Sequence, residues 1–121
     1  MRHRVKKIKV KGGKDANKML MVKLVNNFFV KGKLTTTIKK AKLVKSYIER
    51  LVEKSKVKTE ANKNYLLRYI HDKKLINFLF ETVGPAFKSL KGGYVRIIRI
   101  GQRDSDGSEI GKLEWTQPIT Q

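Results

Sequence analysis

The sequence predicts an α+β fold, in which helices pack on a small mixed sheet in the order α-β-α-α-α-β-β. Two β-rich runs, residues 94–100 and 109–115, flank a polar turn, which is the pattern of a hairpin. An isolated hairpin is marginal in water, so other elements must cover one of its faces. Four segments with helical spacing of apolar residues and one alternating segment are available to do so.

The length and composition predict one folded domain with a basic extension. A chain of 121 residues, of which 40% are hydrophobic, is large enough for a single core. We expect residues 1–14 to form an extended N-terminal arm, residues 15–116 to form the domain, and residues 117–121 to form a short tail.

The net charge of +19 is the main indication of function. Residues 1–45 hold 15 lysines and arginines and one acid, giving +14, whereas residues 46–121 hold 14 and nine, giving +5. This density of positive charge predicts a polyanionic partner, which is RNA, DNA or an anionic membrane surface. The first third of the chain is expected to meet that partner.

The N-terminal arm predicts phosphate contacts that form on binding. Its positive charges repel one another in a compact free state, whereas an extended arm can lay them along a phosphate backbone. A solvated segment or edge strand without a partner is the alternative. The candidate RNA-binding residues of the arm are Arg2, His3, Arg4, Lys6, Lys7, Lys9, Lys11 and Lys14.

Residues 16–30 predict the first helix, with Asp15 as its N-cap. Apolar residues occur most of the way round it, which is typical of a buried helix. Lys18 interrupts the apolar run and is a further candidate RNA contact. The side chains of residues 33–38 alternate between a more apolar face and a polar face, which predicts a short half-buried strand.

Residues 39–54 predict a second helix with a basic start, where Lys39, Lys40 and Lys42 crowd the first turns. Positive charges there oppose the helix macrodipole. A docked anion would offset that cost by accepting hydrogen bonds from the free backbone N–H groups. A solvated basic face is the alternative, and we favour phosphate binding.

Two further helices and the hairpin complete the domain. Thr59 is expected to cap a helix over residues 60–71, and Asp72 to cap one over residues 73–83 that ends at Gly84-Pro85. Hairpin arginines suit phosphate because a guanidinium offers a fork of donors. The candidate RNA contacts of the hairpin are Tyr94, Arg96, Arg99 and Arg103.

The residue types offer little for catalysis or cofactor binding. The absence of cysteine excludes disulfides and thiolate metal sites. His3 and His71 lack carboxylates at metal-ligand spacing, and no nucleophile–base pair can be recognised. No apolar run reaches the roughly 18 residues of a membrane span. We therefore expect a soluble intracellular protein that is no enzyme and takes no cofactor, metal or small-molecule substrate.

Three stretches match the motifs of one known family. The chain opens with Met1-Arg2-His3-Arg4, residues 34–42 read Leu-Thr-Thr-Thr-Ile-Lys-Lys-Ala-Lys, and residues 92–97 read Gly-Gly-Tyr-Val-Arg-Ile. In this order and spacing the chain resembles the bacterial large-subunit ribosomal protein L17 family (bL17). The likeness covers nearly the whole chain, although residues 10–18 depart from the family's pattern and residues 55–74 match it weakly.

The resemblance implies an α+β structural constituent of the bacterial large ribosomal subunit, located in the cytoplasm. It implies binding to large-subunit ribosomal RNA near the nascent-chain exit region, beside neighbouring ribosomal proteins. The charge by itself leaves open a general RNA- or DNA-binding accessory protein without a fixed site, a nuclease or RNA-modifying enzyme, and a membrane-surface binder. If the partner is double-stranded RNA, shape and charge should dominate its recognition.

Overall fold

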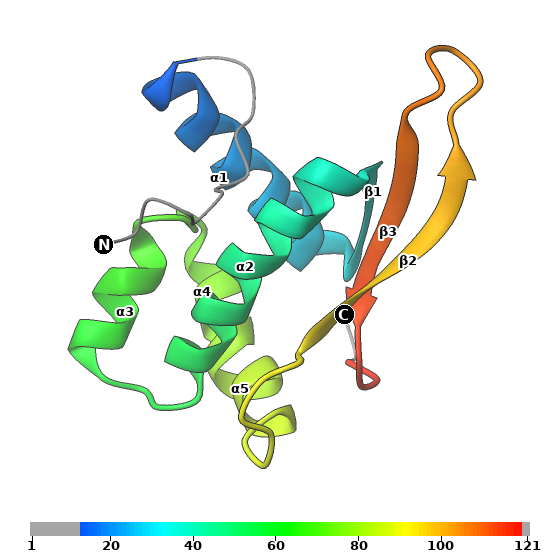
Figure 1. Cartoon of the computed structure of the whole chain (residues 1–121). Coiled ribbons are helices and arrows are strands. Elements are labelled where there is room, and N and C mark those ends of the chain that lie inside the picture. Colours follow the sequence, from blue (N-terminus) through cyan, green and yellow to red (C-terminus); the bar gives the residue numbers. More distant parts are fainter. Residues whose placement is uncertain (1–12, 120–121) are drawn as a thin grey trace, which may run out of the picture.

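Helices form one side of the molecule and a three-stranded sheet the other, in a computed structural model that describes residues 13–119 (Figure 1). The predicted α+β class is confirmed. The helices are α1 (Lys14–Lys31), α2 (Ile38–Ser55), α3 (Glu60–Leu67), α4 (Lys73–Phe78) and α5 (Gly84–Ala86), with the π-helical turn η1 (Leu79–Val83) between the last two. The strands are β1 (Lys33–Thr37), β2 (Val95–Gln102) and β3 (Glu109–Trp115).

The sheet has the order β1-β3-β2 and is antiparallel at both pairings, so the expectation of a mixed sheet is corrected. A short turn joins β2 to β3, and strands joined by a hairpin must run in opposite directions. The pair loses register between Arg99 and Gly101, where Gly101 takes a φ of 132°. Arg99 and Gly101 of this bulge line a hollow together with Ile38, so the bulge lies beside the start of α2.

Helix α2 is the centre of the fold, since it contacts α1, α3, η1, α5 and all three strands. Its buried apolar residues recur every three or four positions, so they form one stripe along the helix. Ala41, Val44, Ile48 and Leu51 of this stripe have no exposed surface. The sequence periodicity therefore correctly predicted which face of this helix enters the core.

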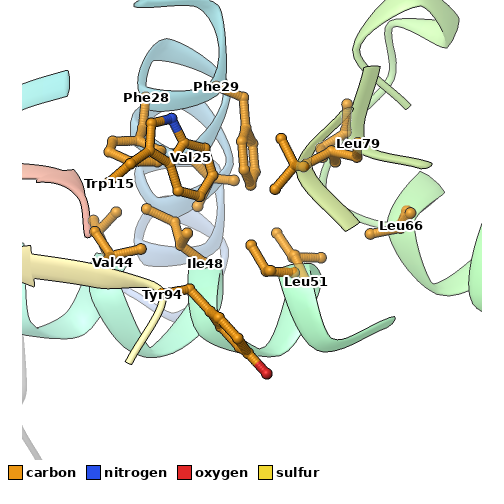
Figure 2. Close-up of a cluster of buried hydrophobic side chains, with 14 of the residues drawn as sticks. Val25, Phe28, Phe29, Val44, Ile48, Leu51, Leu66, Leu79, Tyr94 and Trp115 are labelled. Carbon is orange, nitrogen blue, oxygen red and sulfur yellow. The ribbon is translucent and has the colours of Figure 1, made fainter. Parts of the chain in front are cut away.

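An aromatic cluster joins the sheet to the helices (Figure 2). The Trp115 ring at the end of β3 lies 4.8 Å from the Phe28 ring of α1 and 5.5 Å from the Phe87 ring, measured between centroids. Phe28 and Phe87 are fully buried. Edge and tilted aromatic contacts of this kind add to the free energy of burying the rings themselves.

Two of the predicted helix caps are confirmed and one is corrected. The Thr59 hydroxyl accepts a hydrogen bond from the Asn62 N–H at 3.2 Å, and the Asp72 carboxylate accepts one from the Lys74 N–H at 2.9 Å. The N-cap of α1, however, is Gly13, and Asp15 lies inside the first turn. A negative charge there still favours the helix through its dipole.

The segment after Asp72 is longer and less regular than the sequence indicated. Gly84 and Pro85 do not end the helix, because η1 leads directly into α5, where Gly84 has a helical φ of −55°. A Cβ at this glycine would overlap the backbone of Ser55, so the close approach of two helices explains the residue. Helix α3 ends earlier than expected, at Leu67, and the following turn buries Ile70.

Candidate nucleic-acid interface

The start of α2 is an open, basic surface. β1 ends at Thr37 and α2 begins at the next residue, Ile38, which is buried and anchors the junction. Thr37 occupies the N-cap position without a side-chain hydrogen bond, and no acidic residue lies in the first turn. The first backbone N–H groups of a helix have no partner within the helix, so this end suits an anion.

Lys39, Lys40 and Lys42 lie together at this helix start, as the sequence predicted. None of the three forms an ion pair with any carboxylate among residues 13–119. Lys39 and Lys42 line a surface hollow with Thr37, Ser108 and Glu109, which brings the hairpin beside α2. The lysine charges are therefore available to an external partner.

The hairpin arginines differ from these lysines because each is paired with a carboxylate. Arg96 contacts Glu114 at 2.5 Å, Arg99 contacts Glu109 at 3.0 Å, and Arg103 contacts Asp106 at 2.6 Å. The guanidinium of Arg103 holds the pKa of the Asp106 carboxyl well below its usual range.

The hairpin as a whole is close to neutral. Residues 94–116 hold four lysines and arginines and four acids, so their formal charge cancels. Exposed ion pairs of this kind are worth only about 0–1 kcal/mol, so a phosphate can compete for the arginines at small cost. The predicted RNA contacts of Arg96, Arg99 and Arg103 remain predictions, and the lysines of α2 carry more of the unbalanced charge.

Tyr94 is a core residue, although the sequence suggested a surface contact. Only 1% of it is exposed, and its ring lies 5.3 Å from that of Phe87. Figure 2 shows the ring beside α2, with the hydroxyl oxygen directed away from the cluster. That hydroxyl donates a hydrogen bond to the Glu53 carboxylate. A buried ring leaves no face for a nucleotide base, so the predicted RNA contact of Tyr94 is corrected to a position in the core.

Glu49 and Glu53 connect α2 to the start of β2, a role that was not predicted from the sequence. The two oxygens of Glu49 accept hydrogen bonds from the backbone N–H groups of Tyr94 and Val95, at 3.1 and 3.2 Å. Glu53 binds the Tyr94 hydroxyl and contacts the Lys56 ammonium at 3.2 Å. The two glutamates stand one helical turn apart on α2, and this spacing is the signal that could have indicated a shared partner.

The Tyr94 contact predicts a loss of stability at alkaline pH. Burial, and then the hydrogen bond to Glu53, raise the pKa of the Tyr94 phenol. A raised pKa means that the folded protein holds the proton more tightly than the unfolded chain. The resulting stabilisation is complete below the unfolded pKa of about 10 and is lost as the pH rises through the folded pKa.

We expect Tyr94→Phe to lower the free energy of unfolding at pH 7 by about 0.5–1.5 kcal/mol, because one hydrogen bond is lost. Between pH 9 and pH 11, a range set by the tyrosine pKa of about 10, the free energy of unfolding should fall less in the variant than in the parent. Urea unfolding at several pH values measures both effects. Equal alkaline losses in the two proteins would contradict this account.

The other predicted contacts lie in α1 or outside the described residues. Lys18 lines a groove with Lys23, Arg68 and His71. Of these four residues, only Lys18 was predicted from the sequence as an RNA contact. Lys14 was assigned to the arm, but its backbone begins α1. The remaining predicted contacts of the arm lie outside the described residues. They are Arg2, His3, Arg4, Lys6, Lys7, Lys9 and Lys11.

Residues 13–119 contain no group of three or more histidine, aspartate or glutamate side chains that could hold a metal ion. Within the same residues, none of the helices is both long and apolar enough to cross a membrane.

These features define a small basic α+β domain with an unneutralised lysine surface at one end of its central helix. The family model for Ribosomal protein L17 matches residues 19–116, which is most of the chain. The chain belongs to this family. The predicted resemblance is therefore confirmed.

Curated relatives support the same assignment. The chain is 38% identical over 97 residues to the large ribosomal subunit protein bL17 of Borrelia hermsii, covering 80% of this chain and 79% of the relative. It is 36% identical over 124 residues to the bL17 protein of Fervidobacterium nodosum, covering 94% and 98%. The likeness thus extends over nearly the full length of a relative.

Proposed function

We propose that this protein is a structural constituent of the bacterial large ribosomal subunit and acts in the cytoplasm as part of the ribosome. Its family and the names of its relatives support this role. In this role it binds large-subunit ribosomal RNA and contacts neighbouring large-subunit proteins near the exit region, without catalysing a reaction.

The observation that carries the RNA contact is the group of unpaired lysines at the start of α2. Lys39, Lys40 and Lys42 have no carboxylate partner among the described residues, although every arginine of the hairpin has one. In the free protein, positive charges at a helix N-terminus destabilise the helix because they oppose its dipole. A phosphate group between these lysines and the free N–H groups reverses that cost and releases counterions from the RNA.

Sedimentation through a sucrose gradient tests this function directly. In a native lysate, the protein should travel with the large subunit at about one copy per particle. It should remain there after a moderate salt wash, because a fixed site adds contacts to the shape of the RNA and to neighbouring proteins, which do not depend on counterion release. Release at moderate salt, or sedimentation as free protein, would instead indicate a general RNA- or DNA-binding accessory protein.

The predicted arm can be tested in the same gradient by deleting residues 2–11. This deletion removes six lysines and arginines, so the shortened protein should leave the subunit at a lower salt concentration than the parent. Its thermal unfolding should be almost unchanged, because the deletion leaves in place all the residues that form the observed core. An unchanged release profile would contradict the proposed contribution of the arm.

A further inference from the structure

Three tyrosines form a continuous aromatic surface between α2 and the end of α3. The Tyr47 and Tyr69 rings lie 5.5 Å apart, and the Tyr65 and Tyr69 rings lie 6.1 Å apart, measured between centroids. All three side chains pack against the core but keep part of their surface exposed. The Tyr69 backbone is held in place by the Asn26 side chain, which donates to its carbonyl oxygen at 2.8 Å.

Three cations lie over this aromatic surface. Arg50 is 5.5 Å from the Tyr47 ring centroid, and Arg68 and Lys54 are 5.5 and 5.4 Å from that of Tyr65. All three are exposed, and none forms an ion pair with a carboxylate in the part of the chain that the structure describes. We call these residues the Tyr–Arg cluster. Its members are Tyr47, Arg50, Lys54, Tyr65, Arg68 and Tyr69.

The acidic residues of α2 are engaged elsewhere. Glu49 accepts hydrogen bonds at the start of β2, and Glu53 binds the Tyr94 hydroxyl and Lys56. The cluster therefore has tyrosines and cations without a neutralising carboxylate. An aromatic surface of this charge fits a partner that has both flat rings and negative groups.

The cluster continues into the groove between α1 and the end of α3. Arg68 belongs to both, since it lies over Tyr65 and also lines the groove with Lys18, Lys23 and His71. The groove thus places lysine and imidazole donors beside the aromatic surface. Phosphates could lie in the groove while the attached bases lie on the cluster.

We propose that the Tyr–Arg cluster and the adjoining groove bind unpaired nucleotides of an RNA strand. Bases splayed out of a loop or bulge stack on aromatic rings and on guanidinium planes, whereas paired bases do not offer a free face. The cluster supplies both kinds of stacking partner, and the groove supplies the charge for the phosphates. This site differs in kind from the start of α2, which offers only charge and backbone donors.

This inference rests on the proposed function, because it specifies which part of an RNA the domain contacts. Two probes separate the possibilities. One is a single-stranded RNA of about 12 nucleotides, within the usual range of such binding sites, with 2-aminopurine at its centre. The other is a blunt RNA duplex of the same length. Stacking quenches 2-aminopurine fluorescence, so the single strand reports contact as well as affinity.

The decisive variant is Arg50→Lys with Arg68→Lys, which keeps the charge but removes both guanidinium planes. We expect the full chain with these substitutions to bind the single strand about tenfold or more weakly and to lose most of the quenching, because base stacking contributes substantially to each contact. Binding of the duplex should not change. Both residues are exposed, so the fold should be preserved.

Tyr65→Leu is a second variant that removes a ring and leaves all charges in place. It should also reduce single-strand binding and quenching, and a thermal unfolding measurement shows whether the domain remains folded. The matched control is Lys39→Gln with Lys40→Gln and Lys42→Gln at the start of α2. This control should weaken binding of both RNAs, since it removes charge alone.

Any of four results would overturn the inference. Parent-like single-strand binding and quenching by the Arg50→Lys, Arg68→Lys protein would exclude stacking at the cluster, while the ribosomal function stands. Equal weakening of single strand and duplex by these charge-preserving substitutions would show that the cluster does not favour unpaired bases. A third result is that polyglutamate competes with the RNA for the parent protein but not for the protein with the arginine substitutions. That result would assign the cluster to an acidic protein partner. If the parent chain binds neither RNA, the proposed RNA-binding function fails as well.

Discussion

Replacing Leu79 by Ala is expected to lower the free energy of unfolding by about 2–5 kcal/mol. Leu79 begins η1, is fully buried, and belongs to the same cluster as Phe29, Leu51 and Leu66 (Figure 2). Truncation removes its buried methyl groups and leaves a cavity that packed neighbours fill only in part. The effect should be large because Leu79 belongs to a buried cluster to which α1, α2 and α3 all contribute side chains.

Urea unfolding measures this effect, and Met19→Ala in α1 is the matched control. Met19 is 73% exposed, so its truncation should change stability by no more than about 0.5 kcal/mol. The slope of unfolding free energy against urea should be unchanged in both variants if only stability has changed. Similar losses at the two positions would mean that the core is not centred where the structure places it.

Substituting glutamine for Lys39, Lys40 and Lys42 together is expected to weaken binding to large-subunit ribosomal RNA by roughly a hundredfold at 0.1 M salt. Each lysine that contacts a phosphate contributes about one unit to the slope of log affinity against log salt. The triple variant should therefore show a slope that is smaller by up to about three. Filter binding or fluorescence titration across a salt series gives both quantities.

The same triple variant should be slightly more stable than the parent protein. Lysines at a helix N-terminus oppose the macrodipole, and removing each one is expected to gain a few tenths of a kcal/mol. Weaker binding combined with higher stability separates a functional surface from a structural one. A purely solvated basic face would show the gain in stability without the loss of binding.

The control for total charge is the triple variant Lys58→Gln, Lys88→Gln and Lys91→Gln. These lysines are exposed and lie outside α2, so the net charge changes equally while the helix start stays intact. We expect a much smaller change in the salt slope. Equal weakening by both triple variants would indicate a diffuse charge effect and contradict a defined site at the start of α2.

Several features of the fold could be predicted from the sequence because they depend on residues close together in the chain. The buried stripe of α2 follows from apolar residues every three or four positions, and the hairpin follows from β-rich runs around a polar turn. Thr59 and Asp72 cap their helices through N–H groups two or three residues away. The basic helix start at Lys39 and Lys40 was likewise readable from adjacent residues.

Tertiary packing decided which of the candidate residues face a partner. Tyr94 looked like a surface residue beside glycines and an arginine, but a contact with Glu53, 41 positions away, places it in the core. The sequence around Arg96 and Arg99 indicated free cations. In the structure, the pairing of β2 with β3 places them beside Glu114 and Glu109. Because these partners are far apart in the chain, no local sequence pattern could indicate the contacts between them.

The sequence by itself determined the α+β class, the family, the excess of positive charge and the place where that charge is concentrated. Only the tertiary structure decided the antiparallel pairing of β1 with β3, the pairing of the hairpin arginines and the assembly of the Tyr–Arg cluster from α2, α3 and the turn after α3. The physical reason is the range of the interactions involved. Periodicity and caps act within a few residues, whereas burial and ion pairing depend on which distant segments pack together.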